Sequence, residues 1–340
     1  MRALLEVEHE KRRLDAFCIA VALLNLILCD MAFPAQTGHA HTAPPSGREL
    51  VDEDGRRVQV PRDVNRIVSL APNLTEIVFA LGDGNHLAGD TDYCDYPPEA
   101  LQKPHVGGPV NPNLEEVVAL KPDLVVATSI NRRETVNALE HVGLPVYSVR
   151  DPHSVEEMIT SVEHLGGALG MEKSAAALAE DLRGRLGDLD RRLAGSAPRT
   201  VFFVVWTDPL ISIGRDTFIA DALRRAGGRS VVDTKAEWPH ISLEEIVRLQ
   251  PKFLVFASAH GGDTQRDIDA LRTRPGWRKL EAMQHGNIVV VSDAINRPAP
   301  RMVDAIEQLA RALHPGAFAS SVPPFAGSNP RIEEVCACSR

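Results

Sequence analysis

The chain has 340 residues, which is long for one domain and comfortable for two. Hydrophobic residues make up 44% of it and aromatic residues only 5%, a balance that suits an aliphatic α/β core. The net charge of −9, with no Lys/Arg-rich face in the sequence, argues against a nucleic-acid partner.

The N-terminus has the features of a secretion signal. A basic cluster at residues 11–13 precedes an apolar run of 13 residues at 17–29, which fits a signal-peptide core and is too short to span a bilayer. We therefore expect residues 1–45 to be a signal peptide and linker, and the protein to be periplasmic. Lipid attachment at Cys29 is the less favoured alternative, because Leu28 is large for the position before a lipidated cysteine.

The five cysteines form neither a disulfide framework nor a zinc pattern. Cys18 and Cys29 lie in the signal region, and Cys336 and Cys338 lie close together near the C-terminus. Cys94 is alone in the body of the chain, where we expect it to be a small buried residue.

Turn signals and hydrophobic periodicity predict a first lobe over residues 50–170. Its expected elements, in chain order, are a hairpin at 50–61, a strand at 66–70, a helix ending near 81, a strand from 88, a helix–turn–strand unit at 113–129, a helix at 133–142, a strand at 145–149 and a helix at 154–169.

A proline-free segment at residues 171–193 predicts one helix of about 35 Å, within a connecting region of 171–197. The second lobe, 198–314, should contain a strand at 200–206, a helix at 218–226, a second helix–turn–strand unit at 242–258, a strand at 288–291 and a helix at 301–313. Residues 315–340 read as a loose tail. The expected fold is α/β, with two Rossmann-like βα lobes joined by a single long α-helix that limits hinge motion.

The two helix–turn–strand units are an internal repeat. Residues 113–129 and 242–258 align without a gap, with eight of seventeen pairs identical. Asn113 and Ser242 are each suited to cap a helix, and Glu115 and Glu244 then fall in the first turn, where the helix dipole favours negative charge. The repeat therefore predicts one matched acidic patch on each lobe, so that a partner would find two equivalent docking sites.

Enzyme and metal-site patterns are weak. The glycines of the Gly82-Asp83-Gly84 segment follow a predicted helix rather than a strand, so they form no dinucleotide-binding loop, and P-loop, GxSxG and HExxH motifs are missing from the sequence. The histidines of the body are scattered, which disfavours a direct transition-metal receptor. His240 could still provide an axial ligand to a bound metal complex.

Several motifs together resemble the class III substrate-binding proteins of ABC importers, over about residues 50–313. They are Arg66-Ile67-Val68-Ser69-Leu70-Ala71-Pro72, Asp95-Tyr96-Pro97-Pro98, Val106-Gly107-Gly108, Asn113-Leu114-Glu115 and Leu120-Lys121-Pro122-Asp123-Leu124. The chain is most similar to the cobalamin-binding members, through Trp238-Pro239 followed by Glu244, and through Ser292-Asp293 followed by Arg297.

The resemblance implies a ligand cleft lined by Tyr93, Trp238, Asp293 and Arg297. It also places Pro109 and Ile211 at ligand-binding positions, although cobalamin binders of this type can have a tryptophan near the first and an aromatic residue near the second. His240 completes the candidate ligand-binding set.

The family further implies that Glu115 and Glu244 dock on arginines of a permease dimer, which works with an ATPase. The expected function is capture of a metal-chelate nutrient, preferably cobalamin or another corrinoid, by a monomer without a cofactor or catalytic residues. An iron-siderophore or haem is the alternative ligand. Alternatives of other classes are a Rossmann-like enzyme and a surface sensor module.

Overall fold

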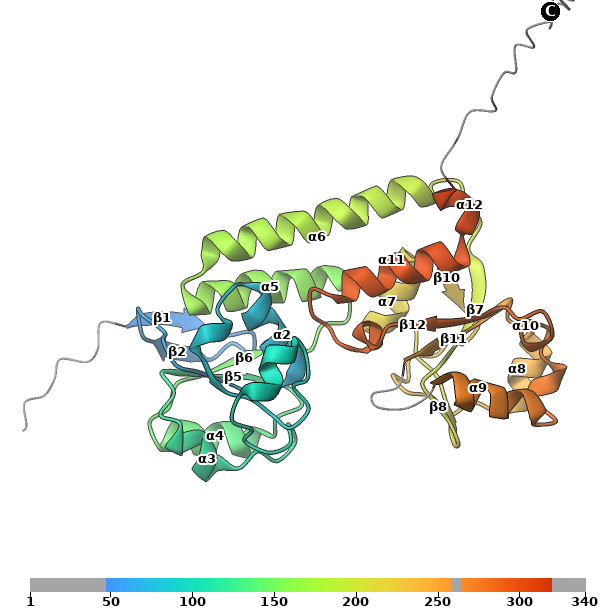
Figure 1. The fold of residues 1–340 in the computed structure, drawn as a ribbon. Helices are drawn as coiled ribbons and strands as arrows, with labels where there is room; N and C mark the ends of the chain where they lie inside the picture. The colour runs from blue at the N-terminus through green and yellow to red at the C-terminus, as the bar shows by residue number, and fades with distance from the viewer. Residues whose placement is uncertain (1–46, 259–263, 320–340) are drawn as a thin grey trace, which may run out of the picture. The chain divides into compact units, whose positions relative to one another are not determined.

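The computed structural model describes residues 47–258 and 264–319 (Figure 1). The predicted signal peptide, Cys29, Cys336, Cys338 and the tail from 320 onward lie outside these residues.

The first lobe is built on a four-stranded parallel sheet of order β4-β3-β5-β6. Its strands are β3 (Ile67–Ser69), β4 (Leu87–Gly89), β5 (Leu124–Thr128) and β6 (Val146–Val149), and its helices are α2 (Pro72–Ala80), α3 (Leu114–Ala119) and α4 (Arg133–His141). The predicted hairpin is confirmed as the antiparallel pair β1 (Arg48–Val51) and β2 (Arg57–Val60).

The second lobe repeats this plan with a parallel sheet of order β10-β7-β11-β12. Its strands are β7 (Arg199–Val204), β10 (Gly228–Ser230), β11 (Phe253–Ala257) and β12 (Ile288–Val291), and its helices are α7 (Phe218–Arg225), α8 (Leu243–Leu249), α9 (Thr264–Thr273) and α10 (Glu281–Gln284). In both sheets the first strand in sequence lies between the second and the third, so each sheet has a point where the strand order reverses.

One prediction for this lobe is wrong in detail. The strand expected to run through Trp206 ends at Val204, and Trp206 instead begins a small antiparallel hairpin of β8 (Trp206–Thr207) and β9 (Leu210–Ile211). Pro209, which lacks a backbone N–H and suits a turn position, lies in the turn between them, where the chain reverses direction.

Two helices connect the lobes. The first is α5 (Val155–Leu169), which is capped by the Ser154 side chain and ended by Gly170 in a left-handed conformation. The second is α6 (Glu172–Leu193), which corresponds to the predicted long helix and has 22 residues. The chain ends its described part with α11 (Met302–Leu313) and α12 (Pro315–Phe318). The prediction that the loose tail begins at residue 315 is wrong by a few residues. Phe318 packs on the core and lies beneath the guanidinium groups of Arg192 and Arg311.

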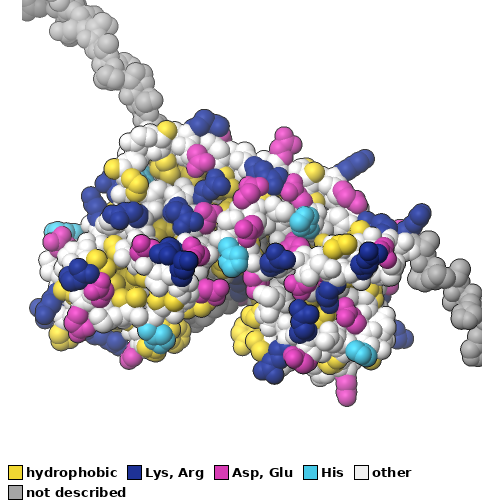
Figure 2. Space-filling view, turned by 180° about the vertical axis from the view of Figure 1, so that it is seen from behind, with side chains coloured by type: hydrophobic (Ala, Val, Ile, Leu, Met, Phe, Trp, Pro, Cys, Tyr) yellow, Lys and Arg dark blue, Asp and Glu magenta, His cyan; other side chains and the backbone are white. Residues whose placement is uncertain are grey.

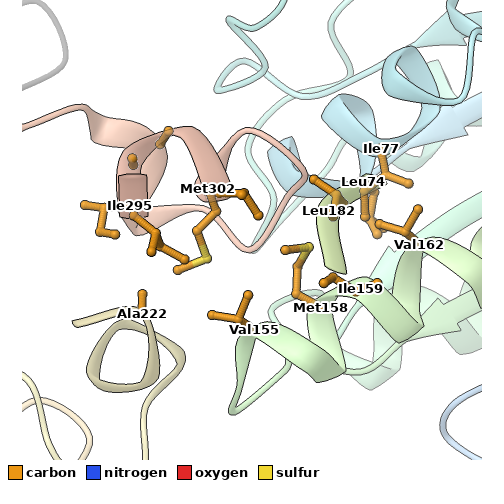
Figure 3. Close-up of a cluster of buried hydrophobic side chains, with 14 of the residues drawn as sticks. Leu74, Ile77, Val155, Met158, Ile159, Val162, Leu182, Ala222, Ile295 and Met302 are labelled. Atoms are coloured by element: carbon orange, nitrogen blue, oxygen red, sulfur yellow. The ribbon is translucent and has the colours of Figure 1, made fainter. Parts of the chain in front are cut away.

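A single hydrophobic cluster extends from one sheet to the other through these helices (Figure 3). Alternate residues of the strands point into it, such as Val126 of β5 and Val255 of β11, while their neighbours Val125 and Leu254 face a separate cluster on the opposite side of each sheet. Figure 3 shows the junction itself, where Met158 and Ile159 of α5 lie near Leu182 of α6. Side chains of both lobes are therefore parts of one continuous core.

The internal repeat is confirmed in its structural details. The Asn113 side chain accepts hydrogen bonds from the backbone N–H groups of Glu115 and Glu116, and Ser242 accepts one from Glu245. The repeat also includes a backbone feature: Lys121 and Gln250, at equivalent positions after the two helices, have φ values of 48° and 42°. They are the non-glycine residues with positive φ in the described chain, so the same tight turn recurs in both lobes.

The two similar parallel sheets and the long helix confirm the predicted α/β fold with two βα lobes. Figure 2 shows Lys/Arg and Asp/Glu side chains interspersed over the face that it presents. Within residues 47–258 and 264–319, none of the helices combines the length and apolar character needed to cross a bilayer.

Candidate functional site

A cavity of about 1240 Å³ opens at the carboxyl ends of strands from both sheets. In the first lobe, the cavity is lined by the start of α2 and by the segments that follow β5 and β6. In the second lobe, it is lined by the end of β7 and its continuation to Trp206, by the start of α7, by the end of β11 and by the end of the turn that follows β12. These segments include those at the reversal points, β3–β5 in one sheet and β7–β11 in the other. Open parallel sheets bind their ligands at such points, because the loops on either side diverge there and leave a crevice.

Two of the predicted ligand residues, Trp238 and Arg297, line this cavity. Trp238 lies in the loop before α8 and is 45% exposed. The other predicted residues of the described chain are not among those that line the cavity; they are Tyr93, Pro109, Ile211, His240 and Asp293. Each of these five nevertheless has a defined position.

Tyr93 and Pro109 belong to neighbouring loops of the first lobe. Tyr93 is 64% exposed, and its loop is held to the next one by a hydrogen bond from the Asp92 N–H to the Gly107 carbonyl at 3.1 Å. The carbonyl of Pro109 accepts a hydrogen bond of 2.6 Å from the side chain of the buried Asn131. Both residues are therefore presented by loops that the fold holds in place.

The Tyr93 loop also rests on two buried groups. Cys94 is buried as predicted, with its Sγ atom 3.2 Å from the hydroxyls of Thr75 and Thr91, and burial raises its pKa to about 11. Asp90 is buried too, and its Oδ1 atom lies 2.8 Å from Nδ1 of His105. The Asp90 Oδ2 atom is buried without a hydrogen-bond partner among the described residues.

Burial raises the pKa of Asp90 to about 6, from an ordinary value of 3.8, although His105 opposes the shift. The folded chain then binds more protons than the unfolded chain between these values, so this carboxyl makes stability fall as pH rises from about 4 to 6. Two pKa units correspond to about 3 kcal/mol. We expect Asp90→Asn to remove this part of the pH dependence, measured by urea unfolding at pH 4 and pH 7. An unchanged difference between the two pH values would contradict the assignment.

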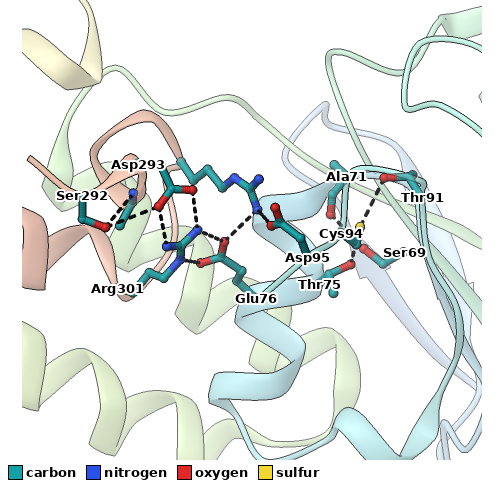
Figure 4. A network of polar contacts seen from close by, with 12 residues as sticks. Ser69, Ala71, Thr75, Glu76, Thr91, Cys94, Asp95, Ser292, Asp293 and Arg301 are labelled. Carbon is teal, nitrogen blue, oxygen red and sulfur yellow. Dashed lines mark hydrogen bonds and ion pairs between the residues drawn. The ribbon is translucent and has the colours of Figure 1, made fainter. Parts of the chain in front are cut away.

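Asp293 and Arg297 belong to a part-buried network of charges between the lobes (Figure 4). Glu76, on α2 of the first lobe, is 2% exposed at its side chain and receives two hydrogen bonds from Arg301 of the second lobe, at 2.7 and 2.9 Å. Arg297 contacts Glu76 at 3.3 Å and Asp95 at 2.5 Å. Arg301 also donates to Asp293 at 3.1 Å and lies 4.4 Å from the ring centre of Tyr96.

The network keeps its charges through mutual pairing. Burial acts against the charged guanidinium of Arg301, but its hydrogen bonds to Glu76 and Asp293 raise its pKa. Burial likewise raises the pKa of the Glu76 carboxyl, and both arginines oppose that shift. The two hydrogen bonds from Arg301 to the Glu76 carboxylate have the bidentate geometry of an ion pair. The predicted ligand residue Arg297 is therefore tied to the first lobe while it lines the cavity.

Several cavity residues were not predicted from the sequence. Trp206 is 60% exposed and lines the cavity from the second lobe. Asp151 follows β6 and accepts a hydrogen bond from the Ser129 hydroxyl; burial raises its pKa, and the negative charge of Glu237 from the second lobe adds to the rise. The position of Asp151 and Ser129 just after parallel strands was the signal that could have identified them.

Glu115 and Glu244 lie away from the cavity, in the first turns of α3 and α8. Both side chains are exposed, and neither forms an ion pair with any described residue. The neighbouring Glu245, in contrast, is paired with Arg248 at 2.6 Å. The repeat thus presents one unneutralised carboxylate on each lobe at equivalent positions.

Two βα lobes with a cavity at the carboxyl ends of both sheets have the architecture of a solute-binding protein. The sequence profile of the periplasmic binding protein family matches residues 67–294, and the chain belongs to this family. Its members are substrate-binding transport proteins, which act with the permease and ATPase of an ABC importer.

Individual relatives agree with this assignment. The chain is 30% identical over 275 residues to an uncharacterised ABC transporter substrate-binding lipoprotein of Bacillus subtilis, covering 78% of this chain and 85% of that protein. It is similar to the structure of the periplasmic vitamin B12-binding protein of Vibrio cholerae, with 28% identity, a TM-score of 0.63, and coverage of 75% and 98%. A periplasmic heme-binding protein from Pseudomonas aeruginosa gives 27% identity, a TM-score of 0.68, and coverage of 74% and 93%.

Proposed function

We propose that this protein captures a metal-chelate nutrient in the cavity between its lobes, with cobalamin or a related corrinoid as the first choice, and delivers it to an ABC permease. The observation that carries the proposal is the cavity at the reversal points of both sheets, walled by the exposed indoles of Trp206 and Trp238. Its volume of about 1240 Å³ exceeds the usual size of a site for a drug-sized molecule, which favours a large ligand.

The lining combines two kinds of chemistry. The indole faces of Trp206 and Trp238 suit stacking on a flat ring system. Arg150, Asp151 and Arg297 add charged groups that can hold the polar substituents of such a ring. Tyr93 would then meet the ligand from the loop of the first lobe, and His240 would reach it from the edge of the second.

A haem or an iron-siderophore is the second candidate, supported by the similarity to a heme-binding protein. An enzyme or a sensor module is less well supported, because the family consists of transport proteins.

The delivery step would use Glu115 and Glu244 as docking residues for arginines of the two permease subunits. Their exposure, their lack of ion pairs within the described chain and their equivalent positions support this role. The route to the periplasm would be the signal peptide predicted at residues 1–45, with lipid attachment at Cys29 as the alternative. We propose that the protein binds its ligand as a monomer.

Titration with cyanocobalamin, haem and a ferric siderophore, followed by tryptophan fluorescence, tests the ligand assignment. The chain contains three tryptophans, of which Trp206 and Trp238 line the cavity while Trp277 is buried in the core of the second lobe. We expect saturable quenching by cyanocobalamin that leaves a residual signal from Trp277. Quenching by haem or the siderophore alone would replace cobalamin as the ligand, and no response to any of the three would contradict the function.

A further inference from the structure

One buried amide joins three segments of the first lobe beside the cavity. Asn131 lies between β5 and α4, and 4% of its surface is exposed. Its side-chain nitrogen donates to the carbonyl of Leu70, just after β3, at 2.9 Å, and to the carbonyl of Pro109 at 2.6 Å. Its side-chain oxygen accepts from the N–H of Thr128, the last residue of β5, at 2.7 Å. The amide thereby uses both of its N–H groups and its oxygen.

Two of these three segments line the cavity directly. They are residues 71–73, which follow β3, and Ser129 with Ile130, which follow β5. The second of them is a tight turn, because the Asn131 N–H donates to the Thr128 carbonyl at 3.1 Å and the Ile130 N–H donates to the Thr128 hydroxyl at 3.3 Å. The Asn131 side chain completes this turn and fastens it to the segment after β3.

The third segment is the loop of residues 107–112, which carries Pro109. The two ends of this loop pair with each other in an antiparallel bridge, so Pro109 lies near its tip. A Cβ atom added to Gly108 would lie 3.8 Å from the ring of Tyr93, which places that exposed tyrosine beside the loop. The hydrogen bond from Asn131 therefore ties the tip of the loop to the carboxyl ends of β3 and β5.

We propose that Asn131 is a positioning residue of the ligand site, whose amide fixes these three segments in their binding conformation before the ligand arrives. This inference rests on the proposed function and adds to it a residue that is not among those that line the cavity. Segments that are already ordered spare the ligand the entropic cost of ordering them. Without the amide, the carbonyls of Leu70 and Pro109 lose a donor, and that cost falls on binding.

Calorimetric titration of the whole chain with cyanocobalamin, haem and a ferric hydroxamate tests the role. We expect Asn131→Ala to weaken binding of the probe that the natural chain binds by about tenfold, the equivalent of one to two lost hydrogen bonds. Asn131→Asp keeps an acceptor for the Thr128 N–H but has no donor for Leu70 or Pro109, so it should lose at least as much.

The matched control is Asp123→Ala, at the opposite end of the same two strands. The Asp123 carboxylate, just before β5, accepts hydrogen bonds of 2.9 Å from the N–H groups of Asn65 and Arg66, just before β3. Asp123 thus joins the amino ends of β3 and β5, away from the cavity, as Asn131 joins their carboxyl ends. Its loss should lower stability and leave the affinity for the probe unchanged.

Hydrogen exchange of residues 106–113 supplies a signature that a loss of stability alone does not produce. In Asn131→Ala, the amide of Asn113, which donates to the Val106 carbonyl at 2.7 Å, should exchange about tenfold faster without ligand. It should regain its protection when the probe is bound. Asp123→Ala should leave the exchange of this segment unchanged.

The outcomes separate the positioning role from the function. If Asn131→Ala binds the probe as tightly as the natural chain, the positioning role is wrong and the transport function stands. Equal losses of affinity in Asn131→Ala and Asp123→Ala would also overturn the role, because both would then reflect lower stability. If no probe binds the natural chain, the proposed function fails and the role fails with it. Asn131→Ser replaces Asn131→Ala, under the same comparison, if the alanine variant does not fold.

Discussion

Replacing Glu76 by alanine is expected to lower the free energy of unfolding by about 3–5 kcal/mol, the cost of breaking a buried ion pair from one side. The Glu76 carboxylate accepts two hydrogen bonds from Arg301 and a third from Arg297, and its side chain is almost inaccessible to water. Without Glu76, the largely buried guanidinium groups of Arg297 and Arg301 lose the acidic partner that lies between them. Urea unfolding followed by circular dichroism measures the loss.

The control for this prediction is Glu180→Ala on α6. Glu180 is exposed and forms no ion pair with the described residues, so its removal should change the free energy of unfolding by no more than about 0.5 kcal/mol. Equal stability of Glu76→Ala and Glu180→Ala would show that the inter-lobe network contributes nothing to folding. The variant Glu76→Gln, which keeps the shape and one acceptor oxygen, should fall between them.

Removing both carboxylates of the repeat should weaken binding to the permease about 100-fold in the double variant Glu115→Gln/Glu244→Gln. Each exposed ion pair contributes only about 1 kcal/mol, so either single variant should lose roughly fivefold. Two pairs on one rigid body reinforce each other, because the second forms at a high effective concentration once the first is made. Affinity for the permease–ATPase complex in lipid nanodiscs measures the effect.

The matched control is Glu116→Gln/Glu245→Gln, which removes the same charge from the same two helices. Glu245 is already paired with Arg248, and Glu116 is the neighbour of Glu115 on α3. This control should bind the permease almost normally, and ligand affinity should be unchanged in both double variants. Equal losses in the two double variants would mean that net charge, rather than these two positions, governs docking.

Local sequence patterns predicted the elements of the fold well because local physics determines them. The capping side chains of Asn113 and Ser242, the glutamates that follow them and the buried strands after the prolines were all readable within short segments, and the structure confirms each. The long helix α6 was predicted to within one residue of its start, because a proline-free, leucine-periodic segment has few other stable conformations.

The site was only partly predictable because its contacts join distant segments. Trp206 was assigned to the strand before it, and only the pairing with Ile211 across the hairpin reveals which face it occupies. Arg297 was identified as a ligand residue, but its contact with Glu76, 221 positions away, depends on how the two lobes pack. Glu76 reads in the sequence as an ordinary polar residue of α2, and its burial between two arginines has no local signal.

The proposed function requires the protein to carry a metal chelate to a membrane importer. The most direct test is ATP hydrolysis by its permease–ATPase complex in liposomes, with the protein added in the presence and absence of cyanocobalamin. Protein and cyanocobalamin together should stimulate hydrolysis and accumulate labelled cobalamin inside the liposomes, and Glu115→Gln/Glu244→Gln should need a far higher protein concentration for both effects. Tight binding of cyanocobalamin with no stimulation and no accumulation would contradict delivery and would favour a sensor role.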